Sequence, residues 1–252
     1  ADEYFGGTVD LSGDSLVVGA SYRGGLAGGV YTFTRSGTTW TQGQILSAPN
    51  AAARFGYAIA QAGATMAISA PLGKDPTSSI TYSCEVYIYT RGVGSKWTSQ
   101  VMLSPAEVAQ DDLYGYSLEL HSGLLAAGAP GRNGSGAWNQ GKTPGKVWLW
   151  TGSGSTWTQA AYLTPSDGQA GDSFGNAVTT EGDTLIVGAP YHDSAAPNAG
   201  AVYIFSKVAN GWVQTGKLIA SDAGADALFG YSAAFVSSTQ FLVGAPGAGK
   251  LY

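Results

Sequence analysis

The residues FGNAVTTEGDTLIVGAP, from Phe174 to Pro190, begin the clearest copy of a unit that the chain repeats. After a loop the unit continues as GAVYIFSKVANGWVQTGKL, from Gly200 to Leu218. Short runs of alternating apolar and polar residues, bounded by glycine and asparagine, are typical of half-buried β-strands. We expect four strands here: one opened by Phe174-Gly175, and three over residues 183–187, 201–205 and 212–218.

The unit recurs at intervals of about 50 to 60 residues. Its copies start near Phe5, Phe55, Tyr114, Phe174 and Phe229. A period of this length with four strands in each copy is typical of a β-propeller, in which repeated sheets surround an axis. We predict an all-β fold, a single β-propeller domain over residues 1–252 with about five blades of four antiparallel strands. The last copy stops after its third strand, so we expect an incomplete fifth blade.

Composition and charge exclude several classes of protein. Hydrophobic residues make up 44% of the chain and charged residues 12%, with 38 glycines, which is typical of a turn-rich all-β protein. The net charge is −5 and the basic residues are scattered, so no nucleic-acid partner is expected. No apolar run approaches the roughly 18 residues of a membrane helix, so no membrane insertion is predicted.

Two kinds of residue are assigned to the core. The single cysteine, Cys84, has no partner for an internal disulfide, and we interpret it as a buried thiol. Tryptophans recur at one register in four copies, which predicts that they pack between neighbouring blades: Trp40, Trp97, Trp157 and Trp212.

Phe-Gly followed by Gly-Ala-Pro, in tandem, resembles the FG-GAP repeat of integrin α-subunit propellers and of bacterial and algal surface proteins. The Trp-Thr-Gln segments at Trp40 and Trp157, and the segment SDGQAGDSFG from Ser166 to Gly175, are most similar to the microbial and algal branch. The resemblance covers the entire chain. It implies a propeller at the cell surface or outside the cell, as a segment of a larger protein.

The sequence offers little for catalysis or metal binding. The loops that hold calcium in integrin-type repeats are short here and poor in carboxylates, so no metal and no cofactor are expected. The segment GAPGAGK, residues 244–250, lacks the Ser or Thr and the helix of a nucleotide-binding loop. The two histidines are His121 and His192, and we interpret His192-Asp193 as a solvated pair. We therefore predict that the protein is not an enzyme.

Loop lengths vary mainly between the second and third strands of each copy. These connections share one face of a propeller with the connections from the fourth strand to the next copy, and variable loops are where repeat folds place recognition. We expect protein or glycan contacts at aromatic, amide and charged residues on this face. The candidates are Tyr22, Arg23, Lys74, Tyr82, Arg132, Asn133, Trp138, Tyr191, His192 and Asp193. Solubilising loops with no ligand would have a similar composition.

Two functions are compatible with this pattern. The first is a non-enzymatic extracellular module, structural or adhesive, that contacts protein or glycan through the variable face. The second is a soluble carbohydrate-binding lectin whose site repeats from blade to blade. Arg132, Trp138 and His192 have no evident counterparts in the other copies, which favours the first function. The open edge at Gly249–Tyr252 predicts a further contact, either with more of a larger parent chain or with a neighbouring copy in a filament.

Overall fold

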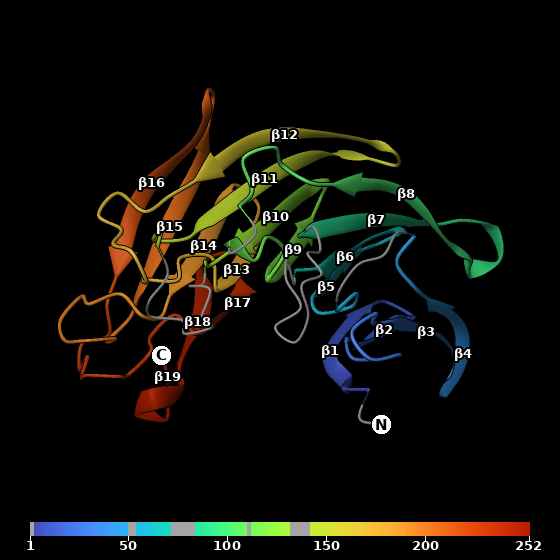
Figure 1. Cartoon of the computed structure of the whole chain (residues 1–252), viewed down its shortest axis with the longest axis horizontal. Helices are drawn as coiled ribbons and strands as arrows, with labels where there is room; N and C mark the ends of the chain where they lie inside the picture. Colours follow the sequence, from blue (N-terminus) through green and yellow to red (C-terminus); the bar gives the residue numbers. More distant parts are fainter. Residues whose placement is uncertain (1–2, 50–53, 72–83, 110–111, 132–141) are drawn as a thin grey trace.

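The structure is a computed structural model that describes residues 3–49, 54–71, 84–109, 112–131 and 142–252. These residues form five antiparallel sheets, the blades of a propeller (Figure 1). Blade 1 contains β1 (Phe5–Ser12), β2 (Ser15–Ala20), β3 (Val30–Ser36) and β4 (Thr39–Leu46); blade 2 contains β5 (Ile59–Ala62), β6 (Thr65–Ala70), β7 (Glu85–Arg91) and β8 (Trp97–Leu103). Blade 3 contains β9 (Ser117–His121), β10 (Leu124–Ala129), β11 (Lys146–Ser153) and β12 (Thr156–Leu163); blade 4 contains β13 (Ala177–Glu181), β14 (Thr184–Ala189), β15 (Ala201–Val208) and β16 (Gly211–Leu218). Blade 5 contains β17 (Ser232–Ser237), β18 (Gln240–Ala245) and β19 (Lys250–Leu251).

The strands of each blade follow one another outward from the axis. The inner strands β1, β5, β9, β13 and β17 contact one another in that order. Blade 5 has three strands in the order β17-β18-β19, so its predicted incompleteness is confirmed, with β19 at the sheet edge. Blades 1 and 5 lie at the two ends of an open arc (Figure 1). The predicted all-β propeller is therefore confirmed.

We expected the aromatic-Gly pair to open the inner strand of blade 4. The pair lies instead in a turn before that strand. The residue before the aromatic has a positive φ in every blade: Tyr4, Arg54, Leu113, Ser173 and Leu228. The glycine that follows the aromatic also has a positive φ, 92° at Gly175. Two left-handed residues around one aromatic interrupt the extended backbone, so β13 begins only at Ala177. In blade 1 the same pair lies within β1, where the pairing with β2 shifts in register between Phe5 and Thr8.

This turn fixes the aromatic ring at the boundary between two blades. Phe174 forms an isolated bridge with Gly145 of blade 3, and its amide donates a hydrogen bond of 2.7 Å to the Pro144 carbonyl. Its ring meets Tyr203 of its own blade edge to face, with ring centres 5.5 Å apart. The same ring pair occurs in all five blades, at 5.1–5.5 Å: Phe5–Tyr31, Phe55–Tyr87, Tyr114–Trp148, Phe174–Tyr203 and Phe229–Tyr252.

The hydrophobic core lies between the blades, in four clusters that each join two neighbouring blades. Three of the four tryptophans that we predicted to pack between neighbouring blades do so. Trp97 is buried at the boundary of blades 1 and 2, and the half-buried Trp157 and Trp212 pack at the next two boundaries. Trp40 is 38% exposed, because blade 1 has no preceding blade to cover it.

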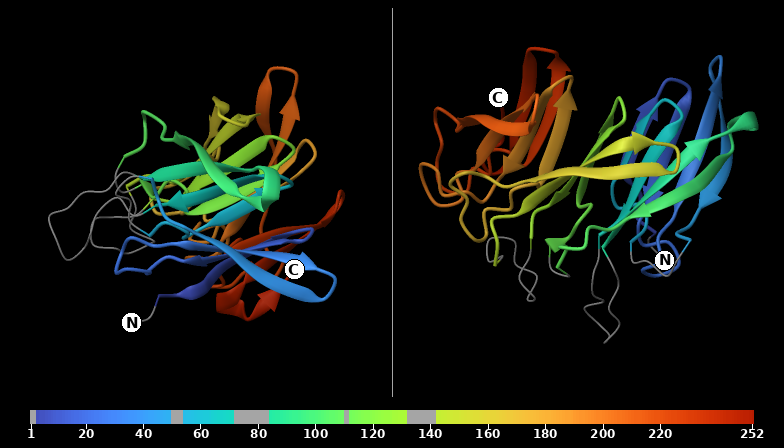
Figure 2. Two further views of the ribbon diagram at one scale, coloured as in Figure 1. Left: turned by 90° about the vertical axis from the view of Figure 1, so that its right-hand side faces the viewer. Right: turned by 90° about the horizontal axis from the view of Figure 1, so that it is seen from above.

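Short hairpins lie along one side of the arc and longer connections along the other (Figure 2). The side of the longer connections is called the loop face below. In blade 4 it carries residues 164–176, which lead in from blade 3, and residues 190–200, which join β14 to β15. Within the described ranges, no helix has the length and apolar character needed to span a membrane.

Candidate functional site

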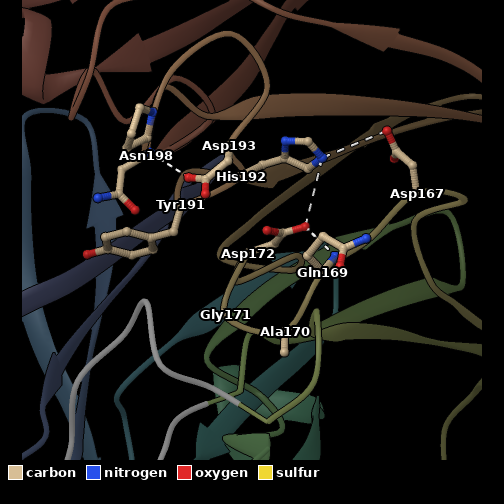
Figure 3. Close-up of a pocket in the computed structure, with 10 residues that line it drawn as sticks. Asp167, Gln169, Ala170, Gly171, Asp172, Tyr191, His192, Asp193 and Asn198 are labelled. Atoms are coloured by element: carbon tan, nitrogen blue, oxygen red, sulfur yellow. Dashed lines mark hydrogen bonds and ion pairs between the residues drawn. The ribbon is translucent and has the colours of Figure 1, made fainter.

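A pocket of about 350 Å³ lies on the loop face of blade 4. The incoming connection 164–176 forms one wall and the connection 190–200 forms the other (Figure 3). Most of the lining side chains are polar, with one tyrosine ring among them. The lining residues are Asp167, Gln169, Ala170, Gly171, Asp172, Tyr191, His192, Asp193, Pro197 and Asn198.

The incoming wall is shaped by the buried carboxylate of Asp172. Its Oδ2 accepts a hydrogen bond of 2.7 Å from the Gln169 amide, which closes a tight turn. Asp112 closes the equivalent turn of blade 3 through the Ala109 amide, at 2.9 Å. Burial raises the pKa of Asp172. The Asp172 side chain therefore has a structural role in this loop as well as a place in the pocket.

The second wall is held by backbone and side-chain bonds around His192. The His192 carbonyl accepts hydrogen bonds from the amides of Ser194 and Gly200, at 3.0 and 2.9 Å. Asp193 Oδ1 accepts one of 2.8 Å from the Asn198 amide, so the Asp193 side chain also stabilises the loop. Asn198 in turn donates through Nδ2 to Asp226, at 2.8 Å, which ties this wall to the loop that leads into blade 5.

His192 is buried between the two walls, with 7% of its surface exposed, so the predicted solvated pair with Asp193 is wrong. The ring packs toward Tyr203, with ring centres 6.1 Å apart. Its Nε2 lies 3.8 Å from Asp167 Oδ2 and 3.9 Å from Asp172 Oδ2 (Figure 3). The same atom lies 3.0 Å from Lys217 Nζ. Its Nδ1 is buried and has no hydrogen-bond partner among the described residues.

Asp167, in the incoming wall, connects that wall to the outer strands of blade 4. Its Oδ2 accepts a hydrogen bond of 2.6 Å from Lys217 Nζ on β16, and its Oδ1 accepts one of 2.8 Å from the Tyr203 hydroxyl on β15. The Lys217 ammonium lowers the pKa of Asp167. Burial, together with the bond to Asp167, raises the pKa of Tyr203.

Of the residues predicted from the sequence, the structure brings Tyr191, His192 and Asp193 into this pocket. Tyr22 and Arg23 lie on the loop face of blade 1. Tyr22 stacks against Tyr4 at 4.6 Å, and the Arg54 guanidinium lies 4.5 Å from the Tyr22 ring centre. The other predicted residues lie outside the described residues: Lys74, Tyr82, Arg132, Asn133 and Trp138.

His192 does have a counterpart, contrary to our expectation, and it is Arg23. Both residues follow a tyrosine after the second strand, and both donate their amide to the last alanine of that strand. Arg23 Cζ lies 5.9 Å from the ring centre of Tyr31, the residue equivalent to Tyr203. The alignment of the repeated copies does not reveal this equivalence, because arginine and histidine are different residue types. The equivalence lies in the backbone hydrogen bonds around them.

Three residues of the incoming wall were not predicted from the sequence: Asp167, Gln169 and Asp172. A signal was present, since all three belong to the segment from Ser166 to Gly175 that carried the family resemblance. We took candidates from the variable loops alone, although both kinds of connection were expected on one face. Lys217 gave no signal, because a lysine at the end of an outer strand is common on protein surfaces.

Neither the single cysteine nor a metal-binding cluster provides a second site in the described residues. Cys84 is buried, and desolvation raises its pKa to about 12, so its thiolate is disfavoured at neutral pH. Within the described residues, no three His, Cys, Asp or Glu side chains are grouped so as to hold a metal ion.

Comparison with known proteins agrees with the repeat pattern. The family model described as FG-GAP repeat matches residues 157–205 and 212–250. A crystal structure of a protein from Lactobacillus plantarum superposes with a TM-score of 0.60 at 15% sequence identity, covering 93% of this chain and 62% of that one. At this identity the likeness concerns the fold alone, and the chain spans less than two thirds of that structure. No curated protein matches the chain.

Proposed function

Because the chain is a β-propeller with FG-GAP repeats, we propose that it is a non-enzymatic extracellular module that binds a glycan through its loop face. In this role it is a structural or adhesive part of a surface protein. The observation that carries the proposal is the pocket between the two connections of blade 4.

The pocket suits a small hydroxylated ligand. Its volume of about 350 Å³ lies at the low end of the range of ligand pockets, room for one or two sugar rings. Carboxylates of Asp167 and Asp193 offer acceptors for hydroxyl groups, and the side chain of Gln169 offers both a donor and an acceptor. The Tyr191 ring offers an apolar surface for the face of a sugar.

The charge of the pocket favours a neutral glycan over an acidic one. Asp167, Asp172 and Asp193 contribute three carboxyl groups, whereas the one lysine ammonium paired with any of them among the described residues is Lys217, which contacts Asp167. An acidic sugar would bring a further carboxylate to the same site, and like charges repel strongly where water is partly excluded.

The same contacts support binding rather than catalysis. A general base needs a lone pair that is directed at a substrate proton. The Nε2 of His192 is already engaged by Lys217, and Asp167 accepts bonds from both Lys217 and Tyr203. In this proposal the titratable groups hold the loops in position, and they transfer no proton.

A second candidate is a lectin with repeated sites. It is favoured by the equivalence of Tyr22 and Arg23 in blade 1 to Tyr191 and His192 in blade 4. The two candidates differ in stoichiometry, because a lectin of this kind would bind one glycan at blade 1 and another at blade 4.

The test is a glycan array with the 252-residue chain, followed by calorimetric titration of the best neutral glycan. One site in blade 4 predicts a stoichiometry of one, loss of binding in Tyr191→Ala and unchanged binding in Tyr22→Ala. A stoichiometry of two, with about half lost in each variant, would favour the lectin. A folded chain that binds nothing on the array would contradict glycan binding.

A further inference from the structure

Two blades contain the same group of three side chains. In blade 4, Asp167 accepts hydrogen bonds from Tyr203 and Lys217. In blade 5, Asp222 accepts hydrogen bonds from Tyr252 and Lys250. Each aspartate lies seven residues before the aromatic of its own blade, Phe174 or Phe229. We call these groups the blade 4 clamp and the blade 5 clamp, since each ties an incoming connection to an outer part of its blade.

Among the residues that the structure describes, the blade 4 clamp makes one contact that the blade 5 clamp lacks. Lys217 Nζ also lies 3.0 Å from Nε2 of His192, in the second wall of the pocket. Lys217 is paired with Tyr203 across β15 and β16, and the residue at the same position of blade 1 is Ile45, paired with Tyr31. The equivalent site around Arg23 is therefore built without this lysine.

The contact with Lys217 determines which ring nitrogen of His192 carries hydrogen. A lysine ammonium has only donors, so a hydrogen bond to Nε2 requires a free lone pair on that atom. The hydrogen of the ring must then be on Nδ1, which lies buried without a partner among the described residues. A buried N–H group without an acceptor is costly, so it favours an acceptor oxygen from a ligand or a water.

We propose that Lys217 is a positioning residue of this site, which holds the two walls together and fixes His192 as the Nδ1–H tautomer. The effect of Lys217 on glycan affinity rests on the proposed function. The tautomer of His192 is a property of the unliganded protein and does not depend on it. The lysine acts through Asp167 and His192, and it distinguishes the pocket of blade 4 from the equivalent place in blade 1.

The test compares Lys217→Met with Lys250→Met. Methionine keeps the length of the side chain and occurs naturally at this position in blade 2, as Met102. Both variants remove the lysine of a clamp, and only the first lies beside His192. We expect Lys217→Met to weaken binding of the array-selected neutral glycan by about tenfold or more, as loss of a charged hydrogen bond does, and Lys250→Met to leave it unchanged. Lys217→Arg should restore part of the affinity, because it keeps a charged donor.

A second readout needs no ligand. The chain has two histidines, so nitrogen NMR of the side chains resolves His192 with His121 as an internal reference. We expect hydrogen on Nδ1 of His192 in the wild type and a shift toward hydrogen on Nε2 in Lys217→Met. Hydrogen on Nε2 in the wild type, or equal weakening by the two methionine variants, would overturn the proposal. If no glycan binds, the proposed function fails, and the NMR result still decides the role of Lys217.

Discussion

Gly188 of blade 4 lies directly against the backbone of Gly230 in blade 5. A Cβ atom on Gly188 would come within 1.9 Å of the Gly230 carbonyl oxygen. Equivalent contacts join Gly19 to Gly56 and Gly128 to Gly175, at 2.2 and 2.1 Å. In blades 1, 3 and 4 the glycine of the Gly-Ala motif therefore meets the glycine of the next aromatic-Gly motif, which explains why both recur at one register.

Gly188→Ala should destabilise the protein by roughly 3 kcal/mol, because a backbone carbonyl cannot move aside without separating two blades. The matched control is Gly244→Ala. The nearest atom to a Cβ there is the Ser232 hydroxyl oxygen, whose side chain can rotate, so its cost should be below about 1 kcal/mol. Urea unfolding followed by tryptophan fluorescence measures both changes, and equal losses would contradict this account of the motif.

The blade architecture could be predicted from the sequence because the repeat fixes it several times over. Each copy carries the same aromatic, glycine and strand pattern, so an error in one copy is corrected by the others. The candidate site could be predicted only in part. Tyr191, His192 and Asp193 belong to one variable loop, whereas Lys217 reaches them from an outer strand through the fold. A contact between segments that do not share a pattern leaves no trace in the spacing of residues.

Trp97→Ala should cost about 3–5 kcal/mol, since the side chain is 3% exposed in the cluster between blades 1 and 2. Trp40→Ala, at the same register of blade 1, should cost much less. Trp40 is 38% exposed at the end of the arc, with the Arg35 guanidinium 5.4 Å from its ring centre. Calorimetric melting temperatures check the order of the two effects. A larger loss for Trp40 would mean that another part of the molecule covers blade 1.

The stability of the protein should fall as the pH rises from about 5 to 8. Glu119 on β9 lies near Asp10 of β1 and Glu181 of β13 and accepts a hydrogen bond from the backbone of Thr180. Burial, and then the charge of Asp10, raise the pKa of Glu119 from 4.5 to about 7. The folded state thus holds this proton more tightly than the unfolded state. Its contribution is complete below pH 4.5 and is lost through pH 7, on the order of 3 kcal/mol.

Glu119→Gln should remove most of this pH dependence, because the amide still accepts the Thr180 bond and carries no charge. We expect the variant to match the wild type at pH 5 and to be more stable at pH 8. Glu107→Gln, at an exposed position, should keep the pH profile of the wild type. Urea midpoints at several pH values decide this, and a flat profile for the wild type would contradict the assignment to Glu119.

The two ends of the arc expose apolar residues that are buried at every internal boundary. Leu242 and Leu251 of blade 5 are 41% and 65% exposed, whereas their counterparts Ile186 and Val202 in blade 4 are fully buried. Phe5 of blade 1 is 56% exposed, although its ring already has the edge-to-face position of its buried equivalents. Exposed patches of this kind favour association. We therefore expect the 252-residue chain to self-associate as its concentration rises.

Leu242→Asp should reduce this association, because it places a charge at the centre of the exposed face of blade 5. The substitution leaves the hydrogen-bonding groups at the edge of β19 unchanged, so it separates contact through the blade face from addition of a strand to the edge. Val93→Asp, at a fully exposed position in the turn between β7 and β8, controls for the added charge. Sedimentation velocity should give a lower average mass for Leu242→Asp than for Val93→Asp. If Leu242→Asp associates as strongly as the control, the edge strand holds the copies together. If the wild type stays monomeric at its highest soluble concentration, the exposed ends do not drive association.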